Sequence, residues 1–254
     1  AAYIEARHKV GMVDAITSAD LGERVNDGLP ETLEEVIAAW GHRYFKLKVG
    51  GNLQADIARL ESIASVLDRL PGPYFASLDG NEQYADTAGV AELVDAIRTR
   101  PALARMWQSI LFIEQPIARK VALDVDLRGA NFGKPVIIDE SDGELDTFVK
   151  ARDRGYAGVS SKTCKGFYKS VLNATRCRQW GNGYFMSAED LTTWPGVSVQ
   201  QDLALVSLLG LTHLERNAHH FIDGMSFAPG AEQCAFVAAH PDLYEKQPGR
   251  PARL

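Results

Sequence analysis

The chain has 254 residues, of which 46% are hydrophobic and 24% charged. This balance is that of a globular domain whose core needs no disulfide support. A net charge of −6 argues against a nucleic-acid-binding surface, and the longest strongly apolar run, near residues 203–211, is too short to cross a bilayer. The 3 cysteines lack metal-ligand spacing, which favours a reducing, cytoplasmic location.

Strands and helices are predicted to alternate along the chain. Short apolar and β-branched runs predict strands at residues 9–17, 44–50, 74–80, 111–116, 135–141, 158–163, 184–190 and 212–217. Apolar residues at helical spacing predict helices at residues 31–41, 53–70, 87–99, 143–155, 166–180 and 198–210.

This alternation predicts parallel strands joined by crossover helices. An α/β fold of the TIM-type (β/α)8 barrel fits best, because such barrels typically have about 250 residues. A doubly wound open sheet is the second choice, but MVDAITSADLGERVNDG after the first strand lacks its glycine-rich phosphate loop. We expect the barrel to span residues 1–226 and the proline-containing residues 227–254 to form an irregular tail packed on it.

Two lysines interrupt the apolar stretch YFKLKVGG at residues 44–51. Lys46 and Lys48 are two residues apart, so on a strand their side chains point to the same face. Because lysine is rarely buried without a partner, negative charge is expected on that face.

Charged residues recur where the predicted strands end. They are Lys48, Asp79, Glu114, Asp139, Lys162 and Glu189. In a parallel barrel these ends lie on one rim, where barrel active sites are found. The carboxylates of Asp79, Glu114 and Asp139 would repel one another there without a cation. Oxygen ligands with no nearby Cys or His suit Mg²⁺, with Mn²⁺ as the alternative.

Lys48 and Lys162 belong to the second and sixth predicted strands, which face each other across an eight-stranded barrel. The two lysines would therefore flank a ligand on the metal. A nearby dication lowers the pKa of a lysine, which can then act as a general base near neutrality. Lys46, one step deeper, would either contact substrate or pair with a carboxylate.

Six short motifs carry a family resemblance. They are KLK at 46–48, LDGN at 78–81, IEQP at 113–116, IIDES at 137–141, SSKTCKG at 160–166 and FMSAED at 185–190. In this order and spacing, the chain from about residue 9 to 217 resembles the enolase superfamily. Within it, the chain is most similar to the mandelate racemase/muconate lactonizing enzyme family, in its muconate-lactonizing-enzyme-like group.

The resemblance implies a (β/α)8 or modified (β/α)7β barrel with Asp79, Glu114 and Asp139 as Mg²⁺ ligands. It implies Lys48 and Lys162 as acid/base residues on opposite faces of a small carboxylate substrate. The implied reaction removes the proton α to the carboxylate to give a metal-stabilised enediolate, with racemisation, epimerisation, dehydration or cycloisomerisation to follow. The family also has an N-terminal capping domain, which residues before 9 cannot supply, and we expect the full-length form to be a homo-oligomer.

Several neighbouring residues are predicted to support this site. Asp139 and Glu140 are adjacent, so on a strand only one can face the site; we favour Asp139 and expect Glu140 to reach a neighbouring lysine. Asn81 would be a turn residue or a group behind the ligands, and Glu189 would lie near substrate.

Other polar residues are expected to lie away from the chemistry. Lys165, beyond its strand, is expected on the surface or behind the site. His213, His219 and His220 are expected at the surface or in the tail.

Two other functions remain open from the sequence. A Schiff-base aldolase could use Lys162 as nucleophile, but it would leave the strand-end carboxylates unexplained. A non-catalytic barrel remnant that has lost its lid is the other possibility.

Overall fold

The computed structural model describes residues 3–190 and 195–244, in which eight parallel strands form one nearly closed barrel. The strands are β1 (Glu5–Val10), β2 (Tyr44–Lys48), β3 (Phe75–Asp79), β4 (Ile110–Glu114), β5 (Val136–Ile138), β6 (Gly158–Ser161), β7 (Phe185–Ala188) and β8 (His213–Arg216). Their order is β7-β6-β5-β4-β3-β2-β1-β8. A parallel bridge between Glu189 and Glu215 joins the two ends of this order. The predicted α/β barrel is confirmed, and the open sheet is wrong.

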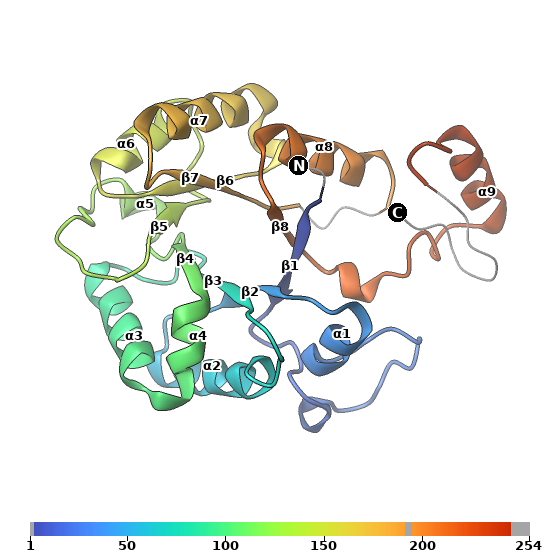
Figure 1. Cartoon of the computed structure of the whole chain (residues 1–254), viewed down its shortest axis with the longest axis horizontal. Helices are drawn as coiled ribbons and strands as arrows, with labels where there is room; N and C mark the ends of the chain where they lie inside the picture. The colour runs from blue at the N-terminus through green and yellow to red at the C-terminus, as the bar shows by residue number, and fades with distance from the viewer. Residues whose placement is uncertain (1–2, 191–194, 245–254) are drawn as a thin grey trace.

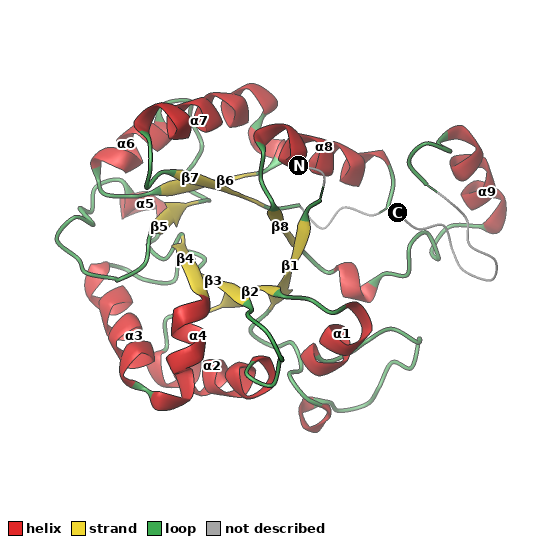
Figure 2. Cartoon of the chain, viewed as in Figure 1, coloured by secondary structure: helices red, strands yellow, loops and turns green. Residues whose placement is uncertain are grey.

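Helices surround the ring of strands (Figure 2). They are α1 (Leu33–Trp40), α2 (Leu53–Leu67), α3 (Thr87–Thr99), α4 (Ala104–Ser109), α5 (Arg119–Ala122), α6 (Thr147–Asp153), α7 (Phe167–Trp180), α8 (Val197–Leu209) and α9 (Gly230–Ala239), with 3₁₀ turns η1 (Ser18–Asp20), η2 (Pro101–Leu103), η3 (Thr163–Lys165) and η4 (His219–Phe221). None of the described helices is long and apolar enough to span a membrane.

Local sequence sets the helix boundaries. The Thr32 side chain accepts a hydrogen bond from the Glu35 amide at the start of α1, which satisfies one of the free amides of the first turn. Gly41 ends α1 with φ 66°, a left-handed conformation that glycine adopts without a Cβ clash. Figure 1 shows α9 beyond α8, outside the ring of helices.

Three predicted boundaries differ from the structure. The first strand is Glu5–Val10 rather than 9–17, because Asp14 turns the chain back by accepting from the Gly11 amide at 2.6 Å. The fifth strand stops at Ile138, because the side chain of Gln115 accepts from the amides of Asp139 (2.8 Å) and Ser141 (3.0 Å) and bends the chain there. The tail from residue 227 is not irregular throughout, since it contains α9 after Pro229.

Side chains alternate between the helices and the barrel interior along each strand. On β2, Phe45 and Leu47 are buried in the apolar core with the surrounding helices, whereas Lys46 points into the barrel and is 1% exposed. Arg7 of β1 fills the interior: it donates to Ser187 Oγ at 2.8 Å and lies 5.2 Å from the centre of the Phe112 ring. The interior is therefore polar and tightly paired, and it opens at the strand ends.

Candidate active site

Lys46 is the centre of the polar barrel interior. Its Nζ lies 2.9 Å from Asp79, 3.1 Å from Glu114 and 4.0 Å from Glu189, and it donates to Glu215. Burial alone would lower the pKa of Lys46, but these carboxylates raise it well above its ordinary value. Lys46 is therefore a fixed cation that neutralises the group, in line with the expected pairing with a carboxylate.

Lys48 and Lys162 lie on opposite sides of this group, because β2 and β6 face each other across the ring (Figure 2). Lys48 donates to Asp79, and its side chain is 16% exposed. Lys162 Nζ lies 2.8 Å from Asp139 and 2.5 Å from Glu189, and its side chain is 14% exposed. Burial would lower the pKa of Lys162, but the two carboxylates raise it. Both lysines are thus at the open end of the barrel, each held by a buried carboxylate.

The carboxylates fit a hard dication. Glu114 is completely buried, and among the described residues neither of its carboxylate oxygens has a hydrogen-bond partner. Burial, its largest perturbation, raises the pKa of Glu114. One oxygen each of Glu114, Asp139 and Glu189 lie within 4.8 Å of one another. An oxygen-only donor set of this kind suits Mg²⁺ or Mn²⁺ better than a softer metal.

Asp79 differs from the other two expected ligands, because it is drawn towards the lysines. It contacts both Lys46 and Lys48, and the pKa of Asp79 is lowered by them against the effect of burial. Glu189, expected near substrate, instead lies with Glu114 and Asp139. The structure therefore adds Glu189 to the three expected carboxylates, and Glu215 of β8 joins them through Lys46.

Residues behind the carboxylates fix their positions. The backbone amide of Asn81 donates to Asp79 Oδ1 at 2.9 Å, and the side-chain Nδ2 of Asn81 donates to Glu140 Oε1 at 3.0 Å. The expectation that Glu140 reaches a neighbouring lysine is wrong, because Glu140 accepts a hydrogen bond from the side-chain amide of Asn81 instead. Lys165 Nζ lies 2.7 Å from Asp139 Oδ1 and donates to the carbonyl of Ser160 at 2.8 Å, so Lys165 acts behind the site.

Two buried residues of this site were missed from the sequence. Glu215 is fully buried at the end of β8, and burial raises its pKa to about 7 although Lys46 opposes the shift. Part of the signal was available, because Glu215 lies one residue before the end of β8. The side chain of Gln115 orients the turn that carries Asp139, and the backbone of Gln115 has a φ of 32°. No local sequence pattern indicates either feature.

The rim beside Lys48 is hollowed. A cavity of about 410 Å³ at the ends of β1, β2 and β3 is lined by Lys9, Lys48 and Asn81 among others. A ligand bound at the carboxylates could extend into this space on the side of β2.

Comparisons with known proteins identify the family of the chain. A family profile described as "Enolase C-terminal domain-like" matches residues 28–241. N-succinyl-L-Arg/Lys racemase of Bacillus cereus is 27% identical over 161 residues, which cover 60% of this chain and 40% of the racemase.

Two solved structures share the fold. A mandelate racemase/muconate lactonizing protein from Herpetosiphon aurantiacus matches with a TM-score of 0.65 and 16% identity, over 86% of this chain and 56% of that one. A dipeptide epimerase from Enterococcus faecalis, complexed with Mg and the dipeptide L-Leu-L-Tyr, matches with a TM-score of 0.59 and 15% identity, over 84% of this chain and 54% of that one. The chain spans about half the length of these relatives.

Proposed function

Because the chain belongs to the enolase C-terminal domain-like family of the mandelate racemase/muconate lactonizing enzymes, we propose that it is the barrel of an isomerase acting on a small carboxylate. Its reaction would invert a carbon atom next to that carboxylate. One observation carries the proposal: Lys48 ends β2 and Lys162 follows β6, two strands that face each other across the ring (Figure 2), and each lysine pairs with a buried carboxylate.

Asp79, Glu114 and Asp139 would hold Mg²⁺, or Mn²⁺ in its place, with Glu189 next to them. The ion would supply positive charge to offset the charge that grows on the substrate carboxylate as its α-proton leaves. Glu114 is suited to this task because it is fully buried and, apart from its ion pair with Lys46 at 3.1 Å, its oxygens have no hydrogen-bond partner among the described residues.

Lys162 needs a change of partners before it can act as a base. Its pairing with Asp139 and Glu189 keeps it protonated. Asp139 cannot bind a metal ion and hold Lys162 equally well. With Asp139 as a ligand, Lys162 would lose a carboxylate partner and gain a cationic neighbour, and both changes would lower its pKa towards neutrality. Lys48 is placed to exchange Asp79 in the same way.

The chemistry then follows from position. One lysine removes the α-proton from its side of the substrate, and the other returns a proton from the opposite side, which inverts the carbon. Lys46 would remain charged, because it keeps Glu215 as a partner even when Asp79 and Glu114 serve as ligands. Lys46 would therefore stabilise negative charge rather than transfer a proton.

N-acylated amino acids and dipeptides are the substrate class we propose. The racemase and the epimerase among the relatives are named for an N-succinyl amino acid and for dipeptides. Both carry a carboxylate, an α-hydrogen and an acyl group on the amine. The cavity of about 410 Å³ beside Lys48 gives such an acyl or side-chain group a place to lie.

The test is α-proton exchange in D₂O, using the full-length protein and N-succinyl amino acids or dipeptides of either configuration. Lys48→Ala should abolish exchange from one enantiomer while exchange from the other persists, and Lys162→Ala should give the mirror result. Lys150→Ala is the control, because Lys150 lies on the surface in a pair with Asp146. Loss of both exchanges in both site variants would leave a one-base mechanism, and no exchange in the unmodified protein would favour the non-catalytic barrel.

The aldolase alternative receives no support from the geometry. A Schiff-base lysine must be neutral to attack a carbonyl, and an aldolase needs no metal ion that would draw Asp139 away from Lys162 and release the lysine from its charged pair. Borohydride trapping with a carbonyl substrate should therefore leave Lys162 unmodified.

A further inference from the structure

Four histidines gather on the outer wall of the barrel, away from the strand-end carboxylates. They are His8 of β1, His42 between α1 and β2, and His219 and His220 of η4. The expectation that His219 and His220 lie at the surface is wrong for His220, which is 4% exposed, and His219 is only partly exposed. His213 lies apart from them, 3.0 Å from Arg7.

The segment after β8 brings the last two histidines to the first strand. His8 lies next to Arg7, which fills the barrel interior, so His8 points outwards. There its ring lies 5.4 Å from that of His42, 5.2 Å from that of His219 and 4.8 Å from that of His220, measured between ring centres. The cluster thus joins three parts of the chain that are far apart in sequence.

Three of these rings have the spacing of ligands around one ion. One ring nitrogen each of His8, His42 and His219 lie within 4.8 Å of one another. Nε2 of His42 and Nε2 of His219 are 3.2 Å apart. Zinc binds histidine nitrogen at about 2.0–2.1 Å, so two nitrogens at a tetrahedral angle are about 3.3 Å apart. The His42–His219 distance is close to one edge of such a tetrahedron.

The tautomer of His219 leaves its Nε2 free to bind a metal ion. Its Nδ1 is 3.1 Å from the carbonyl of Arg216, which can only accept, so Nδ1 carries the hydrogen. Nε2 of a neutral His219 then has a lone pair directed at His42. A backbone carbonyl on the second nitrogen is the usual arrangement for a metal-binding histidine.

Burial keeps these imidazoles neutral, which is the form that binds metals. It is the largest cause lowering the pKa of His8 and of His42, and it lowers the pKa of His219 to about 3. His8 is 3% exposed, and its Nδ1 has no hydrogen-bond partner among the described residues. A buried imidazole nitrogen without a partner is costly, and a metal ion would remove that cost.

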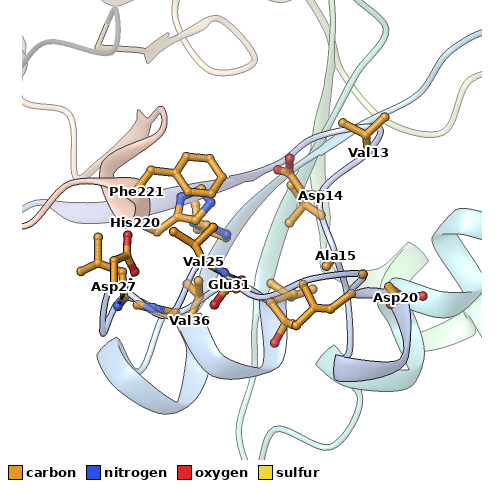
Figure 3. Close-up of a pocket in the computed structure, with 18 residues that line it drawn as sticks. Val13, Asp14, Ala15, Asp20, Val25, Asp27, Glu31, Val36, His220 and Phe221 are labelled. Atoms are coloured by element: carbon orange, nitrogen blue, oxygen red, sulfur yellow. Dashed lines mark hydrogen bonds between the residues drawn. The ribbon is translucent and has the colours of Figure 1, made fainter.

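Space is available on both sides of the cluster. A cavity of about 310 Å³ is lined by His42 and His219 together with Asn217 and Trp40. A second cavity of about 390 Å³ is lined by His8 and His220; Figure 3 shows His220 and Phe221 there with Val25 and Glu31 of the segment between β1 and α1. An ion at the histidines therefore has room for a water or other small fourth ligand.

We propose that His8, His42 and His219 form a binding site for a divalent transition-metal ion, with Zn²⁺ as the reference ion. Imidazole ligands suit Zn²⁺, Ni²⁺ or Cu²⁺, whereas the carboxylates in the barrel suit Mg²⁺. The ion fastens η4, which follows β8, to the outer side of β1 and to the segment between α1 and β2. Its role is structural and independent of the chemistry at the lysines.

The experiment is a Co²⁺ titration of the full chain in excess Mg²⁺, which occupies the carboxylates. Co²⁺ held tetrahedrally by imidazoles gives intense visible absorption bands, and Zn²⁺ should displace it and abolish them. His42→Ala and His219→Ala should weaken Co²⁺ binding by more than the about 10- to 100-fold that loss of an outer partner costs. His8→Gln provides a third variant of similar size should an alanine disturb the fold.

The controls distinguish metal binding at this site from nonspecific metal binding elsewhere on the chain. His240→Gln should bind Co²⁺ as the unmodified chain does, because His240 lies at the end of α9 and contacts Phe236 rather than the cluster. Zn²⁺ should raise the melting temperature of the unmodified chain and of His240→Gln but not of folded His42→Ala, since a ligand that binds only the native state stabilises it. Absence of tetrahedral bands in the unmodified chain, or equal bands in His42→Ala and His240→Gln, would overturn the proposal. The 3.2 Å contact would then be a hydrogen bond between neutral imidazoles.

Discussion

Replacing Lys46 by methionine should destabilise the fold strongly. The side chain is 1% exposed, and its ammonium group contacts Asp79, Glu114 and Glu215, all of them buried. Removing one partner of a buried ion pair costs about 3–5 kcal/mol, because the other charge stays buried without compensation. Methionine keeps the length and apolar volume of the side chain, so little of the loss would come from a cavity.

The neighbouring lysine provides a matched comparison. Lys48 is on the same strand and the same face, but its side chain is 16% exposed and it pairs with Asp79 alone. Lys48→Met should therefore cost clearly less, closer to the about 1 kcal/mol at most that exposed pairs contribute. Mg²⁺ should recover part of the stability of Lys46→Met, because an ion at the same carboxylates replaces the lost positive charge.

Urea unfolding followed by far-ultraviolet circular dichroism measures these differences, provided the slope with urea is unchanged. In a thermal scan, the loss in Lys46→Met corresponds to a lower melting temperature by roughly 6–20 °C, at about 2–4 °C per kcal/mol for a chain of this size. A loss below about 1 kcal/mol, or one no larger than in Lys48→Met, would refute the view that Lys46 holds the carboxylates together.

Further predictions concern the same site. Mg²⁺ should raise the melting temperature by linkage, and Glu114→Gln or Asp139→Asn should blunt that rise; identical melting curves with and without Mg²⁺ would count against a metal site. Burial raises the pKa of Glu215 from 4.5 to about 7, so the stability that its protonated form contributes below pH 4.5 is lost as the pH rises through about 7. Unfolding free energies of Glu215→Gln should therefore fall less over this range, and parallel pH profiles would contradict the shift. Gln115→Ala should lower Mg²⁺ affinity about 10- to 100-fold by loosening the turn that carries Asp139, while Gln54→Ala, at an exposed position of α2, should not.

The strand-end residues were predictable because two simple rules locate them. Side chains on a strand alternate, and parallel strands end on one rim. These rules place Lys48, Asp79, Glu114 and Lys162 together without knowledge of any contact. They also apply to Glu215, which was missed because its strand, THLERN, has other polar residues before and after it.

Other features could not be predicted, because they depend on contacts between distant residues. The end of β5 is fixed by the side chain of Gln115, 24 residues earlier in the chain. The meeting of His42 and His219 joins residues 177 positions apart, and no local pattern distinguishes them from surface histidines. The position of β1 was predicted wrongly because its sequence, EARHKV, is mostly polar. The strand is nevertheless largely covered, and its Arg7 faces the barrel interior.

The pairing of β1 with β8 has a consequence for the synthesis of the chain. β1 leaves the ribosome before the other barrel strands and pairs with β2 on one side, but Arg7 meets its partner His213 only 206 positions later. Until then the other edge of β1 is open, and an open apolar edge invites pairing with another nascent chain. Charged side chains make such an edge a poor template, and β1 carries Glu5, Arg7 and Lys9. The charged side chains of Glu5, Arg7 and Lys9 therefore also disfavour aggregation through the edge of β1 until β8 has been synthesised.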